Sequence, residues 1–472
     1  MKLKSLSVSR LLDYLLAAFI AVSFAFSIYY VFSTIRLSIR QLGTTEILVR
    51  MYDAYCFWYM GQYIRQGSDP FEQFALGIPP RFPIQHIDGG ITTEILDRYK
   101  WCTYSPPPYT PPVMLIYTLL SFFSWHIASG GGQLFILGVH LALGVCLYLY
   151  FQTQTVIRLL RIAYLVISIS ITLSLFYARE ATNAGQPLML SLLLMIAALM
   201  AARRKWDLAA GLALGIALSK YQVALPLAML FFVQRRWKVL AVAAVAQIVS
   251  VVLLSVLVNT SPITIIEHYI NITIAHLPQD ITSSSSLIHL ASFVSPDTWI
   301  LLTTALVLTA LLLAPALPVF KRVWMSRAFP RDQLSEALLL ALLMGWCLLS
   351  VYHMNYDGTM ILFIIIPLTL ISLNVLDVPL SATEKIGLRM LLLIGFLVAV
   401  FPEYTMRIIP RRIILIVSST LVNQPVPPRL VLFTFTLYTL ALTIVTLVII
   451  RRLEKQRASA PEPAPSAAPQ PS

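Results

Sequence analysis

The sequence has few charged residues for its length. Only 12% of its 472 residues are Asp, Glu, Lys or Arg, whereas 58% are hydrophobic, and the mean hydropathy is +0.79. A soluble globule of this size could not cover its surface with so few polar groups. The composition therefore excludes a soluble protein and predicts an integral membrane protein.

Cysteine is also scarce, and its placement excludes a zinc site. The four cysteines show no Cys/His spacing typical of zinc ligands. Cys146 and Cys347 lie inside apolar runs, where a cysteine packs as a small hydrophobic side chain. Cys56 and Cys102 share the first long polar segment, where they form either two free thiols, which we favour, or a disulfide.

Acidic residues are outnumbered, with 21 Asp and Glu against 34 Lys and Arg. In a soluble protein such an excess would suggest a nucleic-acid partner, but here the basic residues stand in short clusters between apolar runs. Clusters of this kind mark the cytoplasmic ends of spanning helices and contact membrane lipids, so we expect no nucleic acid. The clusters are Arg158/Arg161, Arg203–Lys205, Arg235–Lys238, Lys321–Arg331 and Arg451–Arg452.

The apolar runs predict an all-α, multi-pass cell-membrane protein. A spanning helix needs about 20 apolar residues, so residues 1–456 are expected to form one domain of about twelve transmembrane helices. The first span, Leu12–Ile35, follows Lys2, Lys4 and Arg10, which predicts a retained anchor with a cytoplasmic N-terminus. The first loop, about 36–108, is then exterior, and the Pro/Ala-rich tail 457–472 is expected to be disordered and cytoplasmic.

Two segments are predicted not to cross the membrane fully. Thr110–Trp125 is short and begins with a proline cluster, which favours a re-entrant or interfacial helix. The stretch from Arg204 to Arg235 is too short for two full spans, yet both of its ends carry basic clusters. It is interpreted as a hairpin of two shortened helices with Lys220 near its middle.

The first loop contains a tyrosine-rich segment, Tyr52–Gln66, with tyrosines at helical spacing. This pattern predicts an amphipathic helix that lies on the membrane surface. Asp53 stands at its start, where a carboxylate is either a favourable residue of the first helical turn or a catalyst. Asp69, which precedes Pro70, is interpreted as a turn or helix start and not as a base.

Further polar residues are expected at the exterior ends of the helices. Lys220 is a cation within an apolar hairpin and needs an anionic partner, for which a phosphate is one candidate. The alternatives are a side chain that snorkels to the interface or pairs with a distant Glu. The other candidates are Arg179, Asn183, Gln186, His353 and Asp357.

The order and spacing of three stretches resemble glycosyltransferase family 87, the polyprenol-phosphate-mannose-dependent mannosyltransferases with a GT-C type membrane fold. The first is Asp53–Phe71, which ends in a Gly-x-Asp-Pro motif, and the second is the Tyr-x-Pro-Pro of Tyr104–Pro107. The third runs from Gly185-Gln186 through Lys220 to Arg235-Arg236-Trp237. In the second half of the chain the resemblance is mainly in hydropathy.

The resemblance implies a GT-C bundle that transfers a sugar with inversion at the exterior face. Asp53 would be the general base that deprotonates the acceptor hydroxyl, and Lys220 would neutralise the leaving phosphate. Further donor-binding residues would be Arg179, His353, Gln186 and Asn183. Tyr52, Tyr104 and Asp357 would bind the acceptor or form the pocket wall.

The implied donor is a polyprenyl-phosphate-linked sugar, for which we expect mannose, and the implied acceptor is a glycolipid or a cell-envelope glycan. No cofactor is expected, because the donor is itself a co-substrate. The first loop contains no Asp-x-Asp or Glu-x-Asp pair, so no obligatory metal is predicted.

A transporter or flippase of a lipid-linked or anionic substrate is the main alternative. Lys220, Arg179 and His353 would then line a path between shortened helices. This alternative gives the first loop no role.

Overall fold

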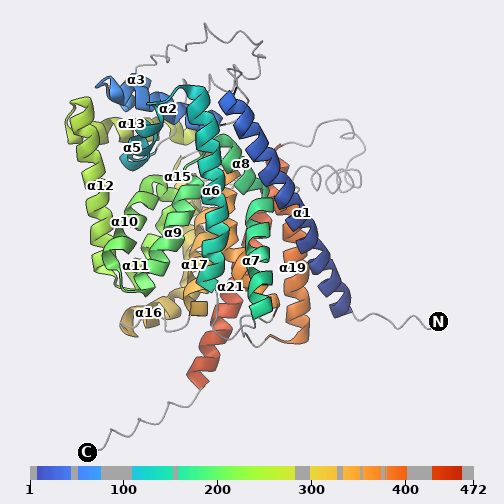
Figure 1. Ribbon diagram of the computed structural model, residues 1–472. Coiled ribbons are helices and arrows are strands. Elements are labelled where there is room, and N and C mark those ends of the chain that lie inside the picture. The colour runs from blue at the N-terminus through green and yellow to red at the C-terminus, as the bar shows by residue number, and fades with distance from the viewer. Residues whose placement is uncertain are drawn as a thin grey trace, which may run out of the picture.

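The computed structural model describes residues 8–43, 51–75, 109–151, 158–281, 287, 298–326, 333–350, 355–373, 378, 380–400 and 428–459. Within these ranges all regular elements are helices, which confirms the predicted all-α fold. The longer helices stand side by side as a bundle (Figure 1).

The helices of the first half are α1 (Val8–Gly43), α2 (Tyr52–Arg65), α3 (Pro70–Ala75), α5 (Pro111–Leu120), α6 (Trp125–Phe151), α7 (Arg158–Ser174), α8 (Phe176–Ala184), α9 (Leu188–Arg203), α10 (Asp207–Ala217), the 3-10 turn η2 (Leu218–Lys220) and α11 (Tyr221–Val233). Those of the second half are α12 (Trp237–Val258), α13 (Pro262–Ile281), α15 (Thr298–Leu313), η3 (Ala314–Ala316), α16 (Leu317–Ser326), α17 (Gln333–Ser350), η4 (Asn355–Ile361), α18 (Leu362–Ser372), α19 (Ala382–Val400) and α21 (Pro428–Ser459).

Several helices are suited to crossing a membrane. By length and composition, the described ranges hold six candidate spans, or up to seven if α7 and α8, which meet at a 63° bend, count as one. Shorter apolar helices, among them α5, α9 and α17, complete the bundle. The chain is therefore a multi-pass membrane protein, while the count of about twelve helices stays a prediction.

Helices α10 and α11 form the predicted hairpin. Together they are long enough for one span, but Asp207 at the start of α10 pairs with Arg236, just after α11, at 3.4 Å. Gly211 lies so close to α12 that an added Cβ would be 2.7 Å from the Val239 carbonyl oxygen. The two ends of the hairpin are thus neighbours, and its tip is η2.

The open end of this hairpin is fastened by one buried carboxylate, Glu336 at the start of α17. Its Oε1 accepts hydrogen bonds from the Tyr150 hydroxyl at 2.8 Å and from Arg203 Nε at 2.9 Å, and its Oε2 accepts one from Gln234 Nε2 at 3.3 Å. A buried charge is stable only when it is paired and hydrogen-bonded. Glu336 therefore joins the ends of α6, α9 and α11.

The basic clusters gather at this same end of the bundle, which we call the basic end. Arg235 stacks over the Trp324 ring at 4.3 Å, and Arg322 pairs with Glu454. The start of α1 and the end of α21 lie at this end in Figure 1, whereas α2, α3, α5 and α13 lie at the other. This arrangement agrees with two termini on one side of the membrane, and which side that is stays a prediction.

Helix α2 matches the predicted segment and packs against the rest of the bundle. Phe57 and Met60 are fully buried, and Ile64 is nearly so. The Phe57 ring contacts Tyr109 at 4.9 Å and Tyr117 at 4.6 Å. A helix with large apolar side chains on several faces is stabilised by burial on several faces, and the position of α2 relative to the membrane surface stays a prediction.

Three boundaries differ from the expectation or complete it. Helix α1 extends beyond the predicted span at both ends, and α21 continues through Ser459, so residues 457–459 are helical. The remainder of the predicted tail lies outside the described residues.

Cys56 is disulfide-bonded, contrary to the favoured free thiols. The thiols of Cys146 and Cys347 are not disulfide-bonded, and Cys102 lies outside the described residues.

Candidate active site

The candidate site lies where the start of α2 meets the end of α8. The Met51 N–H donates a hydrogen bond of 2.5 Å to the Asn183 carbonyl. Met51 (φ 62°) and Gly185 (φ 73°) both adopt the left-handed backbone conformation, which is uncommon for a non-glycine residue. A Cβ on Gly185 would lie 2.5 Å from the Ala54 Cβ, so only glycine permits this approach.

This approach brings Asp53 against Gln186. Gln186 Nε2 donates a hydrogen bond to Asp53 Oδ2, and its Oε1 accepts one from the Tyr109 hydroxyl. The Tyr117 hydroxyl donates to the Gly185 carbonyl at 2.7 Å. Because its oxygen accepts from a tyrosine, the amide presents its NH₂ group to the carboxylate.

Asp53 has the electrostatics of a base. It is 4% exposed, and desolvation by burial raises its pKa to about 7, while the Gln186 hydrogen bond and the charge of Lys220 lower the pKa and Glu180 raises it. A carboxylate with a pKa near the working pH can accept a proton efficiently in a reaction.

Lys220 occupies the tip of the α10–α11 hairpin, close to Asp357 of η4. Its Nζ lies 2.5 Å from Asp357 Oδ1, and both side chains are 3% exposed. It also lies 5.5 Å from the centre of the Tyr109 ring. The Thr110 N–H donates to the Ser219 carbonyl at 3.4 Å, which fixes the hairpin tip to α5. Lys220 therefore does not snorkel. It pairs with an aspartate, Asp357, where the sequence had suggested a phosphate or a distant glutamate.

These contacts form one continuous cluster that runs from Asp53 through Gln186 and Tyr109 to Lys220 and Asp357. Its members come from α2, the end of α8, the start of α5, the hairpin tip and η4. The arrangement places a carboxylate able to accept a proton at one side and a cation at the other. A reaction that removes a proton while it builds negative charge on a leaving group needs these two features.

Two predicted residues take other positions. Arg179 Nη2 donates to the Val400 carbonyl at 3.1 Å, and the guanidinium stacks on Phe26 at 4.5 Å. Arg179 thus faces α1 and α19, because α8 departs from the direction of α7 by 63°. Asn183 contributes its backbone carbonyl to Met51.

Three predicted residues have no described side chain. Tyr104 and His353 lie outside the described residues, and Tyr52 is the first residue of α2 with its side chain outside them. The structure also brings Tyr109 and Tyr117 to the site. Tyr109 belongs to the same tyrosine- and proline-rich stretch as Tyr104, whereas Tyr117 was not predicted there. A signal for Tyr117 existed, because a buried tyrosine hydroxyl needs a hydrogen-bond partner and this residue lies within an apolar helix that starts with proline.

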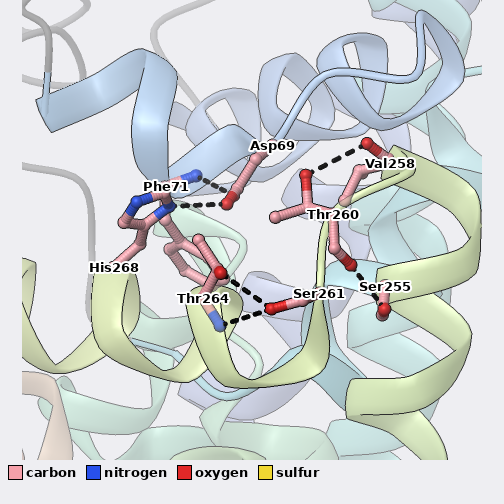
Figure 2. Close-up of polar contacts among 8 residues, drawn as sticks. All are labelled: Asp69, Phe71, Ser255, Val258, Thr260, Ser261, Thr264 and His268. Atoms are coloured by element: carbon pink, nitrogen blue, oxygen red, sulfur yellow. Dashed lines mark hydrogen bonds and ion pairs between the residues drawn. The ribbon is translucent and has the colours of Figure 1, made fainter.

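Asp69 belongs to a separate group of polar contacts near the opposite end of α2 (Figure 2). Its Oδ1 accepts a hydrogen bond of 2.9 Å from the Phe71 N–H, and its Oδ2 lies 2.8 Å from His268 Nδ1. Ser261 Oγ accepts from the Thr264 N–H at 3.1 Å and caps α13. Asp69 thus starts α3 and holds α13 against it, which confirms the interpretation as a helix start.

In the part of the chain that the structure describes, no three or more His, Cys, Asp and Glu side chains are grouped as a metal site would require. Whether the reaction uses a metal stays a prediction.

Comparison with known proteins gives one finding. Residues 108–351, more than half of the chain, match the family model for glycosyltransferase family 87. Neither the curated proteins nor the solved structures give a significant match. The matched segment contains Tyr109, Gln186 and Lys220, whereas Asp53 and Asp357 lie outside it.

Proposed function

Because the chain belongs to glycosyltransferase family 87, we propose that it transfers mannose from a polyprenyl-phosphate donor to a hydroxyl of a glycolipid or cell-envelope glycan at the exterior membrane face. A glycosyltransferase needs a sugar donor and an acceptor, and a multi-pass bundle suits a donor whose hydrocarbon chain stays in the bilayer. The observation that carries the proposal is the buried cluster that joins Asp53 to Lys220.

Asp53 is the general base of this reaction. Its ionised carboxylate takes the proton of the acceptor hydroxyl while the hydroxyl oxygen attacks the anomeric carbon. A glycosidic C–O bond forms, the C–O bond to the phosphate breaks, and the electron pair of that bond leaves with the phosphate. Attack from the side opposite the leaving group inverts the anomeric carbon, and the proton stays on Asp53 until water removes it.

Lys220 stabilises the charge that develops on the leaving phosphate. An ammonium group binds a phosphate as a point charge, and in a site shielded from water its effect on the transition state exceeds its effect in solution. Gln186 and Tyr109 lie between Asp53, the base, and Lys220, the phosphate-binding group, and link the two sides of the site. The products are a polyprenyl phosphate and the extended acceptor.

Two observations favour the alternative function as a transporter. The bend between α7 and α8 and the hairpin with Lys220 at its tip are similar to the broken helices that line transport sites. Family membership supports sugar transfer over transport, and the experiment below separates the two.

The test is transfer of radiolabelled mannose from polyprenyl-phosphate-mannose in membranes that contain the wild-type protein, Asp53→Asn or Asp69→Asn. We expect labelled product from the wild type and Asp69→Asn, and none from Asp53→Asn, which still binds the donor. Product from Asp53→Asn would reject the base. Absence of product from a wild-type protein that binds the donor would favour the transporter.

A further inference from the structure

Two carboxylates lie within electrostatic reach of one cation, and they share it unequally. The charge of Lys220 acts on both Asp53 and Asp357, but its ion pair at 2.5 Å is with Asp357. Asp53 instead accepts a hydrogen bond from the neutral amide of Gln186. The proposed reaction gives a role to Asp53 and Lys220 and leaves Asp357 without one.

We propose that Asp357 is a positioning residue that holds Lys220 in an ion pair, so that Asp53 is left without one and remains able to accept a proton. The inference rests on the proposed function only where it takes the accepted proton to be that of the acceptor hydroxyl. The placement of the charges is a property of the protein without substrate.

The position of Asp357 is fixed by its neighbour on η4. Gly358 packs on the Tyr177 ring of α8 so closely that an added Cβ would lie 2.9 Å from Tyr177 Cγ. Tyr177 is itself buried and packs on Phe435 at 4.5 Å between ring centres. Asp357 is therefore held by packing, and Lys220 is drawn to it.

The charges that face Asp53 come from several elements. Glu180 of α8 raises its pKa and Lys220 of η2 lowers it, while the Tyr117 hydroxyl of α5 and, through Gln186, Tyr109 are close to it. With Asp357 in place, the charge of Lys220 is offset and burial dominates. Without Asp357, the charge of Lys220 would favour the ionised form of Asp53.

The experiment titrates Asp53 directly. Infrared difference spectra of the full-length protein in lipid nanodiscs, recorded without substrate, follow the carboxyl band that Asp53→Asn removes. In Asp357→Asn we expect the midpoint to fall by about one pH unit or more, and in Lys220→Met we expect it to rise. A loss of packing alone would move both midpoints in the same direction, so the opposite signs identify the electrostatic role.

A double variant covers the case in which the single variants fail to fold. Asp357→Asn with Lys220→Met removes both charges and leaves no unpaired buried ion. We expect its midpoint to stay near that of the wild type. A rise as large as that expected for Lys220→Met alone would show that Asp357 does not offset Lys220, and would overturn the inference.

The remaining outcomes separate this inference from the proposed function. Asp69→Asn, which alters a carboxylate outside the cluster, should leave the midpoint unchanged. An unmoved midpoint in folded Asp357→Asn would reject the role of Asp357, even if Asp53→Asn abolishes transfer. A fall in the midpoint would support it, even if the donor sugar proves not to be mannose.

Discussion

Gly185→Ala is the substitution that most directly tests whether the contact between α8 and α2 places Asp53. Gly185 has a φ of 73°, and an added Cβ would lie 2.5 Å from the Ala54 Cβ and 2.8 Å from Met51 Sδ. Both distances are far below a van der Waals contact. The methyl group therefore has to push the start of α2, with Asp53 on it, away from Gln186.

The size of the effect has two parts. The left-handed conformation costs a non-glycine residue about 1–2 kcal/mol, which lowers the free energy of unfolding. The steric part moves the base relative to the reacting groups, and a misplacement of about 1 Å can reduce a catalytic rate by about 100-fold. We expect kcat to fall by that order, beyond any effect on the amount of folded protein.

Gly67→Ala is a matched control for the backbone part. Gly67 also has a φ of 73°, but nothing lies within 4 Å of its added Cβ. Its variant should lose a similar 1–2 kcal/mol of stability and keep the wild-type kcat. The assay is transfer of the sugar from the proposed donor per folded molecule, with folding measured by thermal unfolding in detergent.

The comparison of these two variants can refute the role of Gly185. If folded Gly185→Ala and Gly67→Ala show the same kcat, the close contact at Gly185 does not position the base. The geometry of Asp53 and Gln186 would then have to come from elsewhere in α2.

Three further predictions concern the carboxylates Asp53, Glu336 and Asp69. The proposed base, Asp53, must be ionised to take a proton, and its pKa is raised to about 7. The value of kcat/KM should therefore rise with pH and level off above about pH 7, with a tenfold loss per pH unit well below pH 7. A flat profile from pH 5 to 8 would contradict this. Glu336→Gln leaves Arg203 without its anionic partner and should cost about 3 kcal/mol in the unfolding of the detergent-solubilised protein, whereas an unchanged unfolding temperature would show that the pair contributes no stability. Asp69→Asn weakens the contact with His268 and should speed hydrogen exchange in α13 without moving the acid limb of kcat/KM, and unchanged exchange would show that α13 is held by packing.

The hairpin at Lys220 was predictable because two simple rules meet there. Basic clusters at both ends and too little length for two full spans require the chain to turn back. The structure shows that turn, with Asp207 and Arg236 paired where the two ends meet. The sequence could not indicate which acid would pair with Lys220, since Asp357 is far away along the chain and its position depends on the packing of η4 against α8.

The contact between Asp53 and Gln186 illustrates what a sequence pattern leaves out. Both residues were candidates, but with different roles, because the contact depends on left-handed backbone at Met51 and Gly185. Arg179 was grouped with them by hydropathy, which does not reveal the 63° bend that turns α8. The direction in which a helix runs within the bundle depends on such local bends and left-handed residues, which hydrophobic periodicity cannot detect.

The two buried carboxylates at opposite ends of the bundle differ in a way that indicates where the chemistry lies. Glu336 accepts hydrogen bonds from Tyr150, Arg203 and Gln234 and forms an ion pair with Arg203, so both of its carboxylate oxygens have partners. Asp53 is also buried, yet among the described residues its side chain accepts a hydrogen bond from a neutral amide, that of Gln186, and burial raises its pKa to about 7. A carboxylate left under-satisfied is costly to the fold and is expected only where its reactivity is used, which favours the α2 end of the bundle as the site of transfer.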